Sequence, residues 1–142
     1  MKKILCMDWG GTFMKYALMD EEGKILSSSK VKSPGKGDSK EVLLSCLDKI
    51  VYSFEDIDGI AISSAGVIDS GNGVIEAIGI FPYLNGCAVC EELQERYKVK
   101  VTIENDARCA LGAEVWKGHL QDVQDGAVVV IGTGIGTALF LD

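Results

Sequence analysis

The stretch KKILCMDWGGTFMKYALMD, residues 2–20, decides the fold. A short apolar run ends near Asp8, Gly10 and Gly11 follow, and the next segment alternates between two sets of side chains as a half-buried strand does. A tight glycine connection between two such segments is typical of a β-hairpin, whose turn favours positive φ at its glycines. We therefore predict two antiparallel strands joined by a Gly-Gly turn.

Segments further along the chain extend this hairpin into a sheet with helices. KILSSSKVK (24–32) follows the turn DEEGK and completes a three-stranded meander. Asp38 and Glu41 form a capping-box pattern at the start of the next helix. The stretch 66–77 contains Gly-Asn-Gly and is expected to be a loop. The other elements alternate in the order helix 38–54, strand 58–64, helix 88–97, strand 100–104 and helix 106–118.

The order of these elements predicts the fold class. Three antiparallel strands followed by alternating helices and strands imply an α/β protein with a mixed sheet and helices on its faces. MDWGGT (7–12) and VIGTGIGT (130–137) both end a strand in a glycine turn and a Thr. Because each can open a hairpin, we expect two related domains: residues 1–120 form the first, and 121–142 the first hairpin of a second.

Composition narrows the classes of function. The formal net charge is −7 and no basic stripe is visible, which argues against a nucleic-acid partner. We find no secretory signal and no apolar stretch long enough to cross a membrane, so we expect a cytoplasmic protein with reduced cysteines. Cys87 and Cys90 have no second pair nearby for a zinc site, so we expect them to be small apolar residues on a helix.

The first glycine turn has the residue types of a phosphate site. Backbone N–H groups at Gly10 and Gly11 can cradle a phosphate, and the Thr12 hydroxyl adds a donor. Lys15 can neutralise phosphate charge, and Asp8 can hold Mg²⁺ directly or through water. The alternative is a plain hairpin, and an acidic residue at this strand end favours the phosphate site.

A second glycine turn, IGTGIGT at 131–137, carries Gly132, Thr133 and Gly134. It also suits phosphate binding, although it lacks the Gly-Lys-Ser/Thr ending of a P-loop. A strand rather than a helix follows it, so it is not a Rossmann fingerprint either. One glycine turn at the start of each sheet is a more specific pattern than either turn alone.

Asn105 and Asp106, in IENDARC (103–109), stand at the junction of a strand and a helix. Asn105 is a good N-cap, and the helix dipole stabilises a negative charge in the first turn by about 0.3–1 kcal/mol, so Asp106 has a structural interpretation. The other interpretation is a catalytic base, because α/β sheets bind ligands at the carboxyl ends of strands and phosphoryl transfer tolerates a weak base. Gly66 and Asn85 are candidates to contact a sugar ring and its hydroxyls.

Four motifs occur along the chain: DWGGT (8–12), SSAGVID (63–69), ENDARCALGAEVWKG (104–118) and IGTGIGT (131–137). In this order and spacing they resemble the ROK (repressor, open reading frame, kinase) sugar kinases, of which N-acetylmannosamine and β-glucoside kinases look most similar. These belong to the superfamily of sugar kinases, actin and Hsp70. The resemblance implies RNase H-like domains in a cytoplasmic homodimer that uses ATP and Mg²⁺ to phosphorylate a hexose or N-acetylhexosamine at its 6-OH.

The resemblance also implies roles for single residues. Asp106 would be the catalytic base, and Asp8 would serve the Mg²⁺. The sugar would contact Gly66, Asn85, Asn105 and Asp106. The nucleotide phosphates would meet Gly10, Gly11 and Thr12 from one side, and Gly132, Thr133 and Gly134 from the other.

The chain departs from the family in several ways. Family kinases are longer, and the resemblance implies that the adenine pocket, more sugar ligands and a His/Cys zinc cluster belong to the half that follows, so zinc is expected only there. Because a kinase must close over both substrates, we expect this chain to be inactive alone, with Val128, Val130 and Leu139 of its apolar hairpin pairing with a second copy. The chain starts on its first strand without the helix-turn-helix of repressor members, which favours a kinase. Arg108 stands where a small or amide residue is expected.

Two other classes of function stay open. An RNase H-like nuclease would bind two metal ions at Asp8 and Asp106, although such sites usually have more carboxylates and the acidic charge disfavours nucleic acid. A non-catalytic sugar-binding or interaction fragment would keep the sugar contacts without the reaction.

Overall fold

A mixed five-stranded sheet forms the centre of the computed structural model, which describes residues 1–132 and 134–141. Its strands lie in the order β3 (Ile25–Lys32), β2 (Phe13–Asp20), β1 (Lys3–Trp9), β4 (Gly59–Ser64) and β7 (Lys100–Asn105). The first three are antiparallel neighbours, and β1, β4 and β7 run parallel. This arrangement confirms the predicted α/β class with a meander followed by alternating helices and strands.

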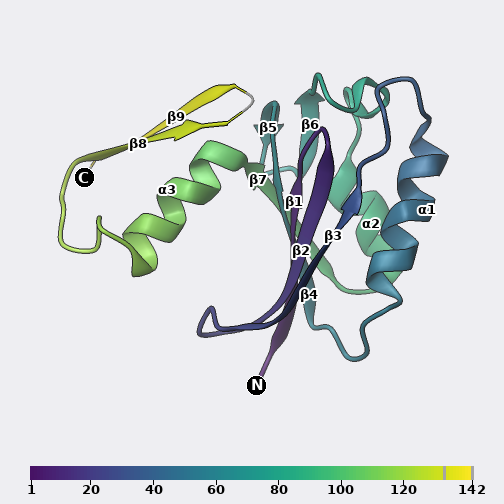
Figure 1. The fold of residues 1–142 in the computed structure, drawn as a ribbon, viewed down its shortest axis with the longest axis horizontal. Coiled ribbons are helices and arrows are strands. Elements are labelled where there is room, and N and C mark those ends of the chain that lie inside the picture. The colour runs from purple at the N-terminus through teal and green to yellow at the C-terminus, as the bar shows by residue number, and fades with distance from the viewer. Residues whose placement is uncertain (133, 142) are drawn as a thin grey trace.

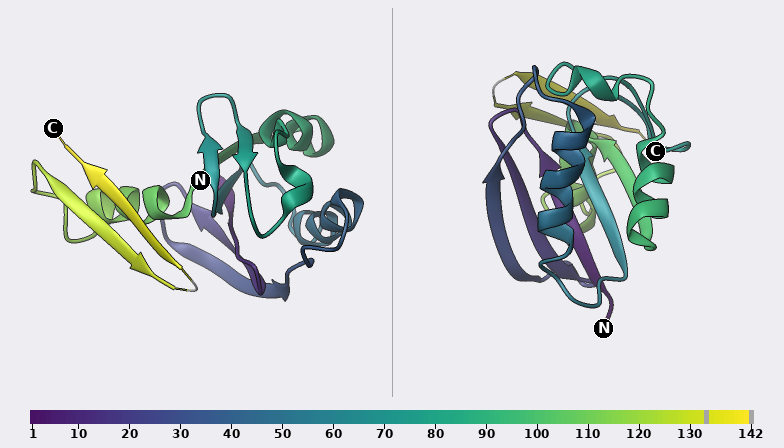
Figure 2. Two further views of the ribbon diagram at one scale, coloured as in Figure 1. Left: turned by 90° about the horizontal axis from the view of Figure 1, so that it is seen from above. Right: turned by 90° about the vertical axis from the view of Figure 1, so that its right-hand side faces the viewer.

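Helices lie on both sides of this sheet. α1 (Lys40–Val51) and α2 (Val89–Tyr97) cover one face, and α3 (Asp106–Lys117) lies on the other side (Figure 1). β8 (Gly126–Ile131) and β9 (Ile135–Phe140) form the predicted second hairpin, which Figure 2 shows alongside α3 and away from α1 and α2. The division into two domains stays a prediction.

Within the described chain, no helix is both long and apolar enough to cross a membrane.

The core lies between the sheet and the helices α1 and α2. Leu5, Met7 and Trp9 alternate along β1 toward this core, because successive side chains of a strand point to opposite faces. Cys6 and Asp8 therefore point to the other face, where α3 lies. The helices and neighbouring strands add Leu43, Leu47 and Ile50 of α1, Val89 and Leu93 of α2, Ile60 and Ile62 of β4, and Val101 and Ile103 of β7.

Residues 66–77 form a hairpin, so the expectation of a loop is wrong. β5 (Val67–Asp69) pairs with β6 (Val74–Ala77) in an antiparallel fashion. The Asp69 carboxylate closes the connection by accepting from the Asn72 backbone N–H at 3.1 Å and from its side-chain amide at 2.7 Å. β5 and β6 are too short to show a recognisable alternation of apolar and polar residues. The glycines between them therefore indicated a loop.

The caps and cysteines also differ in detail from the prediction. Ser39 rather than Asp38 caps α1, because the Asp38 carboxylate accepts the Gly35 N–H at 2.6 Å instead. Cys90 is buried in the core from α2, as expected for a small apolar residue. Cys87 precedes α2 and is half-buried, so it does not lie on the helix.

The β8–β9 hairpin packs one face on α3 and leaves the other open. A Cβ at Gly136 would lie 3.2 Å from the Ala107 Cβ, so the face that Gly136 shares with Val128 and Val130 is turned to α3. Of the three residues expected to pair with a second copy, Val128 and Val130 are half-buried on this face, whereas Leu139 lies on the open one. The open face is apolar, with Val129 57%, Ile131 81%, Ile135 76% and Leu139 70% exposed.

We expect the chain to self-associate through this open face. Residues 126–141 carry no charged side chain, and unprotected strand edges with apolar faces pair with other chains. Light scattering should therefore show an average mass that rises with concentration. A Val129→Lys/Ile135→Lys variant should stay monomeric, whereas Val42→Lys, which changes an exposed valine on α1, should behave as the wild type. A wild-type chain that is strictly monomeric would contradict this expectation.

Candidate functional site

Polar side chains meet where the parallel strands β1, β4 and β7 end. Asp8 is aligned with Ser63 across β1 and β4, and Ser63 with Glu104 across β4 and β7. The Ser63 hydroxyl donates to the Asp8 carboxylate, with 3.2 Å between Oγ and Oδ1. Because parallel strands end at the same edge of a sheet, this register brings Asp8 to the edge where Asn105 and Asp106 begin α3.

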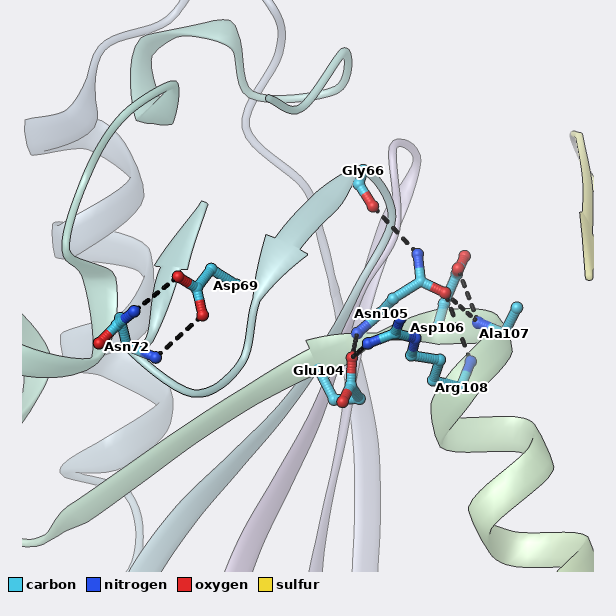
Figure 3. A network of polar contacts seen from close by, with 8 residues as sticks. All are labelled: Gly66, Asp69, Asn72, Glu104, Asn105, Asp106, Ala107 and Arg108. Atoms are coloured by element: carbon cyan, nitrogen blue, oxygen red, sulfur yellow. Dashed lines mark hydrogen bonds and ion pairs between the residues drawn. The ribbon is translucent and has the colours of Figure 1, made fainter. Parts of the chain in front are cut away.

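Asn105 and Asp106 have separate tasks at the start of α3. The Asn105 Oδ1 accepts the N–H of Ala107 at 3.0 Å and of Arg108 at 3.3 Å, which confirms the predicted N-cap. Asp106 is the first residue of the helix, and its half-buried carboxylate lies beside the Asn105 amide (Figure 3). Asn105 is therefore the cap, while one oxygen of the Asp106 carboxylate, Oδ1, also accepts the Ala107 N–H at 2.8 Å.

Gly66 is joined to this helix start. The Asn105 Nδ2 donates to the Gly66 carbonyl oxygen at 3.0 Å (Figure 3). Gly66 has a φ of +105°, and a Cβ there would collide with the Ala77 carbonyl oxygen, so only glycine fits. The exposed backbone of Gly66 thus lies next to Asn105 with no side chain between it and a ligand.

The β1–β2 turn contains Gly10 and Gly11 for a different reason from the one predicted. Neither glycine has a φ in the left-handed region, so the expectation of positive φ is wrong. A Cβ at Gly10 would lie 2.7 Å from the Phe13 carbonyl oxygen, and one at Gly11 would lie 3.2 Å from Ile80 Cγ2. The Ser33 hydroxyl donates to the Gly10 carbonyl oxygen at 2.6 Å. Close packing therefore selects glycine in this turn and holds it in place.

Thr12 and Lys15 continue from this turn into β2. Both are exposed, and Lys15 is paired with Asp8 across β1 and β2, so the two side chains share the face away from the core. Asp8 and Lys15 line a cavity of about 600 Å³ on this face, together with Ser63 and Lys30. The structure thus places Asp8, Lys15 and Ser63 side by side. Asp8 and Lys15 were both predicted for the phosphate site, and Ser63 was not.

The other predicted residues lie in two separate turns. Asn85 is exposed, and its Oδ1 accepts the Ile78 N–H at 2.7 Å. Gly132 and Gly134 close the β8–β9 turn, with 2.9 Å from the Gly132 nitrogen to the Gly134 oxygen, and a Cβ at either would meet open space. Thr133 lies outside the described residues. Figure 1 shows this turn and the β1–β2 turn both toward the upper edge of the view.

Sequence reasoning missed Ser63 and Cys109. Burial raises the pKa of the Cys109 thiol, a hydrogen bond with Ser63 partly offsets this, and the charges of Glu104, Asp106 and Asp8 raise it further. The carboxylates whose charges act on this thiol belong to three different elements, Asp8 to β1, Glu104 to β7 and Asp106 to α3. The sequence held one sign that Cys109 belongs to the site. Cys109 follows Asp106 by three residues, so the two share one face of the helix.

Arg108, which had no explanation in the sequence, turns back along β7. Its Nη1 lies 3.8 Å from the Glu104 Oε1, and the same Glu104 oxygen accepts the Asn105 N–H at 2.7 Å (Figure 3). Arg108 is 64% exposed, so this ion pair contributes little to stability. The ion pair with Glu104 keeps the Arg108 guanidinium on the β7 side of the start of α3.

The chain matches the ROK family over residues 4–142. It is 35% identical over 138 residues to a beta-glucoside kinase of Klebsiella pneumoniae, an alignment that covers 97% of this chain and 46% of that protein. The structure of the Lmo2764 protein from Listeria monocytogenes, provisionally named an N-acetylmannosamine kinase, matches 98% of this chain and 47% of its own with a TM-score of 0.90 and 32% identity.

A third relative was solved with ligands. The structure of a ROK family glucokinase from Streptomyces griseus in complex with glucose and AMPPNP matches 98% of this chain and 44% of its own, with a TM-score of 0.85 and 25% identity. The chain therefore belongs to the ROK family, as the four motifs indicated. It spans about half the length of the relatives it matches.

Removing the charge of Asp106 should speed the alkylation of Cys109. Neighbouring carboxylates raise the pKa of this thiol, so Asp106→Asn should lower that pKa and increase the thiolate fraction at a fixed, mildly alkaline pH. Mass spectrometry after timed iodoacetamide treatment measures the rate for this cysteine. Glu95→Gln, which removes an exposed carboxylate on α2, is the matched control. Equal Cys109 rates in the two variants would show that Asp106 and the thiol are not neighbours.

Proposed function

We propose that this chain is the N-terminal part of an ATP-dependent kinase that phosphorylates a hexose or N-acetylhexosamine, at the 6-OH. The observation that carries the proposal is the position of Asp106, at the start of α3 and at the sheet edge where Asp8 also lies. The relatives support it, since they are named for β-glucosides and N-acetylmannosamine, and the glucokinase was solved with glucose and AMPPNP.

Asp106 is the proposed catalytic base. Its carboxylate accepts the hydrogen bond of the sugar hydroxyl and directs that oxygen toward the γ-phosphorus of ATP. As the new O–P bond forms and the bond to the departing ADP breaks, Asp106 takes the hydroxyl proton. A carboxylate in the first turn of a helix is a weak base because the dipole stabilises its charge, and the loose transition state of phosphoryl transfer requires no stronger one.

The sugar is proposed to bind through N–H donors. The Asn105 amide already uses its oxygen for the cap and one N–H for Gly66, which leaves its second N–H for a sugar hydroxyl. The Asn85 oxygen is occupied by Ile78, so Asn85 also presents donors. Together with the exposed backbone of Gly66, which Asn105 contacts, these donors favour a ligand rich in hydroxyl acceptors.

The phosphates and Mg²⁺ are proposed to bind near Asp8. Mg²⁺ is commonly held by one or two carboxylates together with phosphate oxygens and water, and the Asp8 carboxylate beside the Ser63 hydroxyl fits such a donor set. A bound Mg²⁺ neutralises charge on the phosphates during transfer. The proposed phosphate contacts are Gly10, Gly11, Thr12 and Lys15 from the first sheet and Gly132, Thr133 and Gly134 from the second hairpin.

We also propose a cytoplasmic homodimer. The five cysteines are free thiols, which fits a reducing compartment, and ATP as phosphoryl donor fits the same location. The open apolar face of the β8–β9 hairpin supports association. A nuclease that uses Asp8 and Asp106 for metal ions is the weaker alternative, because the named relatives are kinases.

Asp106→Asn tests the proposed base in the longer kinase. The variant keeps the shape of the side chain but cannot take the proton, so kcat should fall by roughly 10²–10⁴-fold with little change in sugar Kd. A coupled ADP-release assay and calorimetry measure the two quantities. Asp56→Asn, in an exposed loop, should leave both unchanged. Near wild-type turnover of Asp106→Asn would leave Asp106 with a structural role alone.

Gly11→Val tests the first phosphate turn. The added side chain would meet Ile80 and project from the exposed turn, so nucleotide affinity should fall by at least about tenfold while sugar binding persists. Calorimetric titration with AMPPNP and with glucose separates the two effects. Gly37→Val, at an exposed glycine whose Cβ would meet open space, controls for the loss of a glycine. Unchanged AMPPNP affinity in a folded Gly11→Val protein would exclude the turn as a phosphate site.

A further inference from the structure

The helix that carries Asp106 is attached to the rest of the fold at both ends. At its start, Asn105 donates to the Gly66 carbonyl oxygen. At its far end, the Trp116 ring lies against Gly23 in the β2–β3 turn. The Lys117 ammonium donates to the Glu22 carbonyl oxygen in the same turn. α3 therefore spans the sheet face that α1 and α2 leave uncovered.

Little core packing holds α3 between these two attachments. Among the residues that the structure describes in this helix, only Ala107 is buried, and it lies in the first turn. The β8–β9 hairpin also lies alongside this helix, and its closest printed approach, Gly136 against Ala107, is again near the start. At its far end, α3 is held to the five-stranded sheet by its contact with the β2–β3 turn.

Gly23 is shaped to receive the Trp116 ring. Its φ is +80°, which favours glycine, and a Cβ there would lie 2.7 Å from Trp116 Cη2 and 2.9 Å from Cζ3. The Asp20 carboxylate holds the turn by accepting the N–H groups of Glu22 at 3.0 Å and Lys24 at 2.9 Å. Trp116 itself is 54% exposed, so its ring covers the turn without joining the core.

We infer that Trp116, seated on Gly23, is a positioning residue for Asp106 in the proposed phosphoryl transfer, on which this inference rests. Over a helix of about 18 Å, release of the far end by about 5 Å turns the first residue by about 15°, which is the angular tolerance of a catalytic group. The contact at one end of α3 thereby sets the direction of the carboxylate at the other end.

Hydrogen exchange on the 142-residue chain tests the mechanical part without any activity. Trp116→Ala should raise the exchange rates of the Ala107 and Arg108 N–H groups by about tenfold or more, while core amides of β1 and β4 keep theirs. Gly23→Ala should have the same effect. Gly86→Ala is the matched control, because Gly86 has a similar φ of +74° but a Cβ there would meet open space. Faster exchange confined to residues 114–118 would overturn the inference.

Kinetics of the longer kinase test the catalytic part. Trp116→Ala should lower kcat on the order of 10–100-fold with little change in the KM for sugar, because a misplaced group costs rate rather than binding. Trp116→Phe keeps a ring on Gly23 and should restore most of the rate. If Asp106→Asn abolishes turnover but Trp116→Ala does not alter it, the positioning role is wrong and the kinase proposal stands. If the longer protein has no kinase activity, the exchange data still decide whether Trp116 holds α3.

Discussion

The side chain of Asn105 connects three parts of the molecule. Its oxygen caps α3, its nitrogen holds the Gly66 backbone, and its own position at the end of β7 places both at the edge of the sheet. An amide is suited to this task because it is donor and acceptor at once. An aspartate here would keep the cap but repel the Gly66 carbonyl, and it would add a second charge beside Asp106. The arrangement of the site therefore depends on one neutral side chain.

The parallel part of the sheet explains why residues distant in sequence meet at this point. Asp8, Ser63 and Glu104 are aligned across β1, β4 and β7, and all three strands end at one edge. The antiparallel β2 adds Lys15 beside Asp8 on the same face. The core-facing side of these strands is tightly packed, whereas the site side is covered by a helix with few buried residues. Packing thus fixes the strands, and polar contacts set the position of the acidic groups on the other face.

The sheet and helices were predictable because burial repeats along the chain with a regular period, as for Leu5, Met7 and Trp9. The Asn105 cap was predictable because capping is local. Cys109 was not recognised, because its environment is created by the register of strands far away in sequence. The glycines of the first turn were recognised from the sequence. A sequence does not tell, however, whether a glycine is needed for a positive φ or for lack of room for a side chain. At Gly11 the room is limited by Ile80, which is distant in sequence.

The central claim is that Asp106 faces the hydroxyl that receives the phosphate. A crystal structure of the longer kinase with its hexose and AMPPNP tests this most directly. An Asp106 carboxylate oxygen should lie about 2.6–3.2 Å from the acceptor hydroxyl, with that hydroxyl in line with the γ-phosphorus and Asp8 on the metal side of the phosphates. A hexose whose acceptor hydroxyl lies beyond hydrogen-bond reach of Asp106 while in line with the γ-phosphorus would contradict it.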